Sequence, residues 1–208
     1  MLPVAPVTLA DEVVILEPLS TSHVESLHCA SSRDRSTFGW TFVPSSLEGW
    51  AAYVAYFLDE QSRGLSIPFA TLDGRTRRVI GSTRFMAIER WPWGVVAPVE
   101  ARPTGCADAV EIGSTWLASE AQRTAINSHA KLLMLTHAFE VWEVRRVTLK
   151  TDARNVRSRT AIERLGAKLD GVLRAHMPAS DGSVRNTALY SILAAEWPDV
   201  KAALQSRA

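Results

Sequence analysis

The segment from residue 109 to residue 142 constrains the fold more than any other part of the sequence. It opens with an apolar run, AVEIGSTWL at 109–117, which predicts a strand. A polar stretch without glycine follows at 119–128 and leads into a long amphipathic helix. The first N–H groups of such a helix have no partners within it, and the helix dipole adds to their attraction for an anion. The segment therefore predicts a strand–loop–helix unit suited to a pyrophosphate at Gln122–Ser128.

An ordinary connection is the alternative interpretation of this segment, with Asn127 or Ser128 serving only as the helix cap. A basic stretch further along the chain bears on the choice. Between Arg145 and Arg185 there are ten Lys and Arg residues against four acidic ones. Because the net charge of the chain is only +1, this excess suggests an anionic ligand, although a solvated basic face would give the same pattern.

Strand and helix patterns also fill the remainder of the chain. Asp73-Gly74 and Asp181-Gly182 supply the turns of two hairpins. The order βααβββαβαββα predicts an α/β fold (α+β mixed) with a central mixed, largely antiparallel, twisted sheet of about seven strands and helices on both faces. The further strands are expected at 13–19, 67–72, 79–88, 146–151, 168–176 and 184–194, and the further helices at 20–32, 47–63, 155–165 and 196–204.

Length and composition favour one cytoplasmic domain. The 208 residues suit a single domain, 1–208, with a core at 13–197, an N-terminal extension at 1–12 and a short C-terminal helix or tail at 196–208. Two isolated cysteines indicate a reduced, cytoplasmic protein, and no apolar run is long enough for a membrane span. Neither a nucleic-acid partner nor a metal site is expected, since the charge is balanced and no ligand spacing occurs.

A second segment, KTDARNVRSRTAIERLGAKLDG at 150–171, places a polar turn after a strand and then a short helix that ends in Leu165-Gly166. This pattern, with Asn155 and Ser158, resembles the GCN5-related N-acetyltransferase (GNAT) superfamily, whose corresponding helix begins Asn-x-x-Ser/Ala. The opening ILEPL and the closing YSIL resemble its RimJ/RimL-type branch. Gln122–Asn127 takes the place of the family's Gln/Arg-x-x-Gly-x-Gly/Ala pyrophosphate loop.

The resemblance implies a GNAT fold with a V-shaped splay between the fourth and fifth strands, and an enzyme that uses acetyl-CoA as co-substrate. Relatives in this branch are commonly dimeric, so a homodimer is compatible with it. The free edge of the 109–117 strand would pair with the pantetheine arm through its backbone. The residues implied in cofactor binding are Trp116, Leu117, Gln122, Arg123, Thr124, Ala125, Ile126, Asn127, Ser128, Asn155 and Ser158.

The chain departs from the family pattern at three positions. Ala125 and Asn127 replace the loop glycines, and we expect Asn127 to make the turn, because asparagine tolerates left-handed dihedral angles. Ile162 stands where many members have the tyrosine that protonates the leaving thiolate. Ser158 is then the candidate for that role, with an exposed helix hydroxyl as the alternative.

Glu111, eleven residues before Gln122, is the candidate base for the amine, since many members carry a strand carboxylate there. The alternative is an ordinary hydrogen-bonded strand carboxylate. Asn155 could likewise be only a helix cap. The acceptor pocket is expected to involve the 38–46 loop, the helix of Trp50 and the Trp91–Trp93 loop, although aromatic residues there could simply cover or fill the core. The candidate substrate-binding residues are Phe38, Trp40, Trp50, Trp91 and Trp93.

The predicted activity is transfer of an acetyl group to a primary amine by direct attack in a ternary complex, with a protein N-terminal α-amine as the favoured acceptor. One alternative is a small amine, such as a polyamine, an aminoglycoside or an amino sugar. A pocket for a polycationic amine would need several carboxylates, and Glu48, Glu89, Glu100 and Asp108 are the candidates. A second alternative is a non-catalytic acyl-CoA-binding sensor, which the glycine-poor loop favours.

Overall fold

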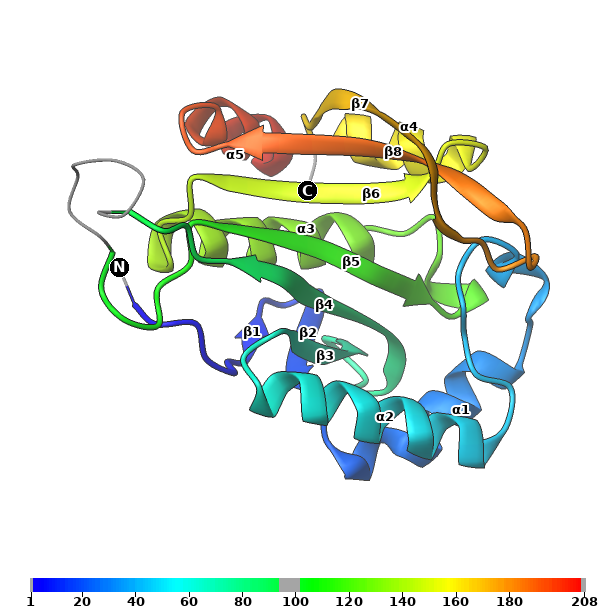
Figure 1. Ribbon diagram of the computed structural model, residues 1–208. Helices are drawn as coiled ribbons and strands as arrows, with labels where there is room; N and C mark the ends of the chain where they lie inside the picture. The colour runs from blue at the N-terminus through cyan, green and yellow to red at the C-terminus, as the bar shows by residue number, and fades with distance from the viewer. Residues whose placement is uncertain (1, 94–101, 207–208) are drawn as a thin grey trace.

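The computed structural model describes residues 2–93 and 102–206, and these form one eight-stranded sheet with helices on both faces (Figure 1). The strand order is β1-β2-β3-β4-β5-β6-β8-β7, and the β5–β6 pair is parallel whereas the other neighbours are antiparallel. The predicted mixed sheet is thus confirmed. The strands are β1 (Leu9–Ala10), β2 (Val14–Pro18), β3 (Ile67–Asp73), β4 (Val79–Glu89), β5 (Ala109–Leu117), β6 (Arg146–Asp152), β7 (Lys168–Pro178) and β8 (Val184–Leu193). The short β1 comes from the segment expected to be an extension.

Two apolar clusters pack on opposite faces of the sheet. One face is covered by α3, α4 and α5, with Phe85, Met134 and Trp142 in the cluster. The other face is covered by α1 and α2, with Trp50, Val54 and Trp116 in the cluster. None of the helices formed by the described residues is both long and apolar enough to cross a membrane. The helices are α1 (Val24–Ser32), α2 (Leu47–Ser62), α3 (Ile126–Thr136), α4 (Val156–Arg164) and α5 (Trp197–Gln205).

The sheet opens between β5 and β6. Their parallel pairing extends over only three residue pairs, from Ala109↔Arg146 to Glu111↔Thr148. Beyond Glu111 the two strands diverge, as Figure 1 shows for the green and yellow-green arrows. The edge of β5 that faces β6 therefore lacks a strand partner from residue 112 onward. This is the splay expected between the fourth and fifth strands. Because the two-residue β1 adds one strand at the start of the chain, these strands are numbered β5 and β6.

A β-bulge in β5 lies beside this opening. Arg84 pairs with Gly113 and Ser82 pairs with Trp116, so Thr83 alone faces both Ser114 and Thr115. The extra residue is accommodated by the left-handed backbone of Ser114, whose φ is 49°.

Helix caps fix the boundaries of the two helices nearest the opening. Ser46 caps α2 by accepting from the Gly49 N–H, and Asn155 caps α4 by accepting from the Ser158 N–H at 3.1 Å. Gly64 and Gly166, with φ of 69° and 91°, follow the C-terminal ends of these helices, where a side chain would strain the backbone.

Two local expectations differ from the structure. Helix α3 begins at Ile126, three residues before the expected start of the amphipathic helix after residue 128. It changes to a π-helical turn at His137–Val141. In the β3–β4 hairpin the left-handed residue is Arg77, with φ of 57°, and not Gly74. Gly74 is needed for another reason, because a Cβ there would lie 2.5 Å from the Glu12 carbonyl oxygen.

Candidate active site

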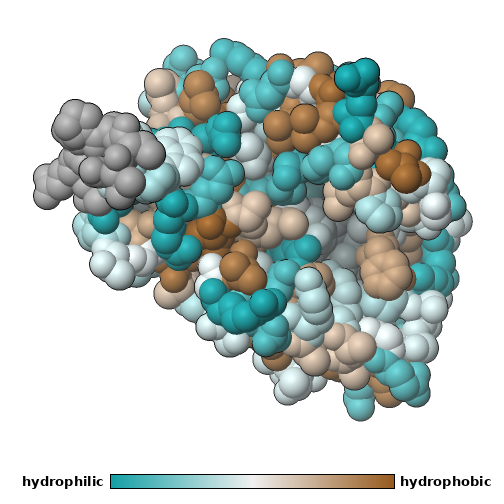
Figure 2. Space-filling view, in the orientation of Figure 1, coloured by the Kyte–Doolittle hydropathy of each residue, from teal (hydrophilic) through white to brown (hydrophobic). Residues whose placement is uncertain are grey.

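A cavity of about 1350 Å³ lies where β5 and β6 diverge. Its wall includes the free part of β5, the 122–128 loop, the first turns of α4, the α1–α2 loop and the β7–β8 hairpin, together with residues of α2, β4 and β6. Figure 2 shows the corresponding hollow to the right of the centre, between apolar and polar patches. Backbone groups that the diverging strands leave unpaired therefore face an open space and not a neighbouring strand.

Glu111 is the most buried carboxylate of the cavity, with only 5% of the residue exposed. Lys150 Nζ lies 2.7 Å from its Oε2 as an ion pair, yet Oε2 accepts no directed hydrogen bond from the described residues. Burial of a carboxylate with an unfilled acceptor position is unfavourable unless a ligand fills it. Glu111 can therefore receive a hydrogen bond or a proton from a molecule in the cavity.

Two buried donors without acceptors among the described residues line the same cavity. They are Arg84 Nε and Trp116 Nε1. The Arg84 guanidinium lies 3.7 Å from the centre of the Phe57 ring, and its Nη1 is 3.3 Å from Glu60. Burial lowers the pKa of Arg84, although an arginine stays charged at neutral pH. Arg84 shares the α2-facing side of the sheet with Glu111, so this side of the cavity holds one buried acceptor and two buried donors that form no hydrogen bond with the described residues.

The 122–128 loop presents backbone amides toward the opening. The N–H groups of Asn127 and Ser128, in the first turn of α3, have no acceptor among the described residues, and both residues line the cavity. The left-handed residue of the loop is Arg123, with φ of 62°. The expectation that Asn127 makes this turn is wrong, because Asn127 is already helical.

Side chains brace this loop from three directions. Gln122 Nε2 donates to Thr37 Oγ1 at 2.8 Å and to the Leu117 carbonyl at 2.9 Å. Its Oε1 accepts from Arg157 Nη2 of α4 at 3.3 Å. The side chain of Gln122 is thus fully engaged in holding the α1–α2 loop, β5 and α4 around the cavity.

The first turns of α4 contribute polar side chains. Asn155 and Ser158 are half-buried and both line the cavity. Asn155 Oδ1 is used in the cap, which leaves its amide nitrogen for a ligand. Arg123, Arg157 and Arg164 line the same side, so an anion is attracted there.

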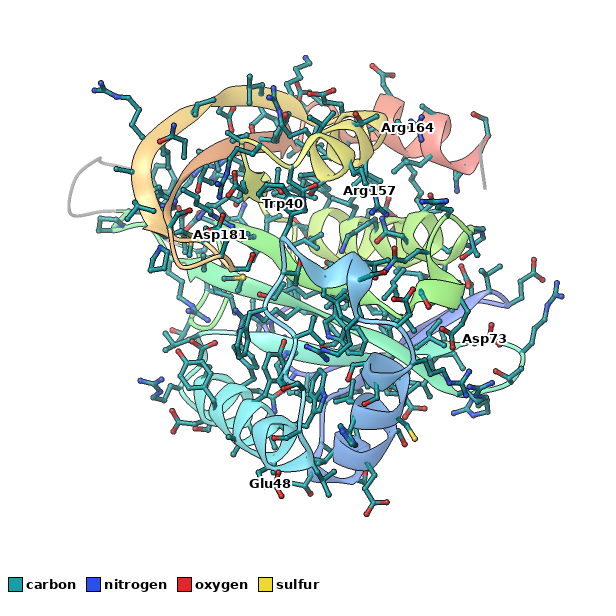
Figure 3. All side chains as sticks on the ribbon, turned by 90° about the vertical axis from the view of Figure 1, so that its right-hand side faces the viewer. Trp40, Glu48, Asp73, Arg157, Arg164 and Asp181 are labelled. Carbon is teal, nitrogen blue, oxygen red and sulfur yellow. The ribbon has the colours of Figure 1, made fainter. Side chains whose placement is uncertain are left out.

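The two halves of the molecule meet again across the outer end of the cavity. Arg154 lies over the Trp40 ring at 5.0 Å from its centre and forms ion pairs with Asp152 at 2.8 Å and Asp181 at 3.1 Å. Hydrogen bonds from Arg154 hold the pKa of Asp152 below its usual range. Figure 3 shows Trp40 beside the hairpin that carries Asp181, with Arg157 to its right. The α1–α2 loop and the β7–β8 hairpin therefore form a joint wall.

Most of the predicted site residues come together around this cavity, but five do not. Trp50 is fully buried behind Trp116, with ring centres 5.3 Å apart, so it supports the wall without lining it. Trp91 and Trp93 pack near Asp108, to which the Trp91 N–H and the Trp93 Nε1 donate at 2.8 Å. The residues that line the cavity are Phe38, Trp40, Glu111, Trp116, Leu117, Gln122, Arg123, Thr124, Asn127, Ser128, Asn155 and Ser158, and those that do not are Trp50, Trp91, Trp93, Ala125 and Ile126.

The sequence reasoning missed Arg84 and the burial of Lys131. Arg84 belongs to an ordinary strand sequence that contains no recognisable motif. Its place in the cavity follows from its pairing opposite Gly113, which the sequence does not reveal. Lys131 interrupts the apolar face of α3, and that interruption was the available signal. Only 4% of this residue is exposed, beneath the sheet.

The described residues fit coenzyme A. A diphosphate needs backbone N–H donors and positive charge, and the first turn of α3 and three arginines offer both. The amides of a pantetheine arm need an unpaired strand edge, and β5 has one from residue 112 onward. The methyl group of Ala125 does not obstruct this fit, because Ala125 is exposed and does not line the cavity.

Comparisons with family models and with solved structures point to the same family. Residues 14–168 match the acetyltransferase (GNAT) domain model. A T. thermophilus protein assigned to the acetyltransferases is 31% identical, with 99% of each chain covered and a TM-score of 0.79. A GCN5-related N-acetyltransferase from Brucella melitensis is 26% identical, with 99% of this chain and 86% of that chain covered and a TM-score of 0.80.

A structure of RimJ from Mycobacterium smegmatis in complex with CoA-disulfide shares the fold. Its TM-score is 0.78 at 19% identity, with 100% of this chain and 97% of that chain covered. A search of curated proteins by sequence found no match.

Proposed function

The chain belongs to the acetyltransferase (GNAT) family and is an N-acetyltransferase; we propose that it transfers the acetyl group of acetyl-CoA to the α-amine of a protein N-terminus. The proposal is supported by three buried polar atoms on the α2-facing side of the cavity that form no hydrogen bond with the described residues. Glu111 Oε2, although paired with Lys150, can accept a further hydrogen bond, and Arg84 Nε and Trp116 Nε1 need acceptors. A peptide N-terminus supplies both, because its amine donates and its first carbonyl groups accept.

Acetyl-CoA supplies the activated acetyl group as a thioester. The proposed contacts on this chain are the α3 amides of Asn127 and Ser128 for the diphosphate, and the β5 edge at Trp116 and Leu117 for the pantetheine arm. Gln122, Arg123 and Thr124 complete the loop around the diphosphate. Ala125 and Ile126 do not line the cavity and would only connect the residues that do. The Ile126 side chain is buried in the core, and its N–H donates to Thr124 Oγ1.

Glu111 would accept a proton from the amine and so keep it neutral for attack. An α-amine, with an ordinary pKa of about 8, requires less of a base than a lysine amine at about 10.4. Lys150, whose Nζ lies 2.7 Å from Glu111 Oε2, would hold the carboxylate in position until the amine binds. Ser158, which lines the cavity at the start of α4, is the proposed hydrogen-bond donor to the departing thiolate.

The residues of the cavity favour a peptide over a polycationic amine. The carboxylates expected for the latter do not line it: Glu48 lies at the start of α2 (Figure 3), Glu89 and Asp108 contact the Trp91–Trp93 region, and Glu100 falls outside the described residues. A site for a polyamine or aminoglycoside would need those negative charges near the acceptor.

An acceptor panel tests the proposal directly. Short peptides with free N-termini, the same peptides blocked at the N-terminus, spermidine and an aminoglycoside are each incubated with acetyl-CoA, and released CoA is measured together with product mass. We expect acetylation at the α-amine of the free peptides alone. Acetylation of spermidine or the aminoglycoside in preference to every peptide would contradict the proposed acceptor. Binding of acetyl-CoA without transfer to any amine would favour the sensor function.

A further inference from the structure

Lys131 is a buried cation for which the proposed reaction has no use. It lies on α3 with 4% of the residue exposed, and it faces the underside of β4 and β5. Its Nζ donates to Thr115 Oγ1 at 2.6 Å and to Thr83 Oγ1 at 3.1 Å, and these two hydroxyls lie 2.8 Å apart. A lysine amine and two hydroxyls thus form a closed triangle between a helix and two strands.

The triangle forms around the β5 bulge. Side chains alternate along a strand, so an unbroken β5 would place Thr115 on the same face as Glu111 and Gly113, toward α2. The bulge at Ser114 shifts the register by one residue. Thr115 therefore turns toward α3, and Trp116 turns toward α2, where it packs against Trp50. The hydrogen bond from Lys131 to Thr115 can form only in the bulged register.

We infer that Lys131 is a positioning residue that holds β5 in its bulged register and thereby sets the strand edge along which coenzyme A binds. The inference rests on the proposed cofactor site, because it assigns the free edge of β5 to the pantetheine arm. Two of the residues whose backbone would face the cofactor, Gly113 and Trp116, flank the bulge, and Leu117 follows directly. Loss of the amine removes the hydrogen bond that ties Thr115 to α3, so that Thr115 keeps only its contact with Thr83 of the neighbouring strand, and this permits β5 to shift.

The electrostatic surroundings of Lys131 contain no compensating charge among the described residues. Arg84 of β4 and Glu111 of β5 project from the opposite face of the sheet, as does Lys150 of β6, which pairs with Glu111. On α3 itself, His129 pairs with Asp11, and the other charged groups of the cavity on this side are arginines of the loop and of α4.

Burial lowers the pKa of Lys131 to about 7 as a result. The amine is therefore uncharged in part at neutral pH and gains its charge as the pH falls. An amine that lines the cavity and becomes charged below about pH 7 attracts the anionic cofactor more strongly there.

Isothermal calorimetry with coenzyme A tests the inference on full-length protein. Thr115→Val keeps the shape but removes the hydroxyl, and Lys131→Met keeps the length but removes the amine. We expect each to weaken binding about tenfold, the effect of one well-made polar contact. The double variant should be no weaker than either single variant, because both remove the same interaction. Thr115→Ser, which retains the hydroxyl, should bind as the wild type does.

The matched control is Lys168→Met, which removes an exposed lysine paired with Glu196 and should leave affinity unchanged. The ratio of the Lys131→Met to the wild-type dissociation constant should rise as the pH falls through about 7. Equal affinity of Thr115→Val and wild type, additive losses in the double variant, or a ratio independent of pH would each overturn the inference. Absence of coenzyme A binding by the wild type would instead overturn the proposed function.

Discussion

The two sides of the cavity are built in different ways. The side toward α3 and α4 consists of short contiguous segments, the 122–128 loop and the start of α4, and offers mainly backbone N–H groups and arginines. The side toward α2 consists of single buried side chains from separate strands, such as Arg84 on β4 and Glu111 on β5. Backbone amides suit a constant ligand, whereas single side chains can change the acceptor without altering the fold. Substitutions on the two sides should therefore separate cofactor affinity from turnover.

The largest expected effect is on the acceptor side. Glu111→Gln removes the proposed base while it keeps the size and a hydrogen-bonding group. We expect kcat/KM for a peptide acceptor to fall about 100-fold, the lower end of the range for general bases, with unchanged affinity for acetyl-CoA. Steady-state kinetics from pH 6 to 9 and calorimetry provide the two readings. Wild-type turnover at every pH would exclude Glu111 as the base.

Arg84→Met tests the same side through binding of the acceptor. Its loss removes the buried Nε donor, and we expect the KM for a peptide to rise about tenfold while the affinity for acetyl-CoA stays the same. Arg63→Met, which removes an exposed arginine paired with Asp59, is the matched control. If Arg84→Met weakened cofactor binding and left the KM unchanged, Arg84 would belong to the other side.

Lys131 lies beneath the strand that both sides share, and its lowered pKa makes stability depend on pH. The unfolded chain keeps this lysine protonated up to about pH 10.4, whereas the folded protein releases the proton near pH 7. The free energy of unfolding should therefore increase by up to about 1.4 kcal/mol per pH unit between pH 7 and 10, relative to Lys131→Met. Urea unfolding of both proteins across this interval measures the slope. Parallel curves would show that the lysine stays charged.

The smallest expected effect is on the cofactor side. Asn155→Ala removes both the α4 cap and the proposed contact with the pantetheine arm. We expect a loss of about 1 kcal/mol in stability and a several-fold weaker affinity for acetyl-CoA. Asn155→Ser retains a cap but not the amide nitrogen, so it should restore stability without restoring affinity. Recovery of both would reduce Asn155 to a helix cap.

The difference between the two sides also explains what could be predicted from the sequence. Strands, helices and the cofactor side follow from local signals, such as the AVEIGSTWL run, the caps Ser46 and Asn155, and the Leu-Gly stop at residue 166. The acceptor side depends on strand register. Arg84 reaches the cavity because it pairs opposite Gly113, immediately beside a bulge that no local pattern indicated.

The same reason accounts for the predictions that the structure did not support. Trp91 and Trp93 were expected in the acceptor pocket from their place in a loop, but hydrogen bonds to the buried Asp108 hold them elsewhere. The left-handed turn expected at Asn127 is made by Arg123, because α3 begins at Ile126 and Asn127 is already helical. Loop direction and helix starts depend on tertiary contacts that a single sequence does not contain.

Hydrogen–deuterium exchange in the presence and absence of coenzyme A shows which backbone amides the cofactor protects. We expect slower exchange for the amides of 123–128 at the start of α3 and for 112–117 along the free edge of β5, with β2 and β3 unchanged. No protection at saturating coenzyme A, or protection confined to the α2-facing side, would contradict the claim that this edge and this helix terminus bind the cofactor.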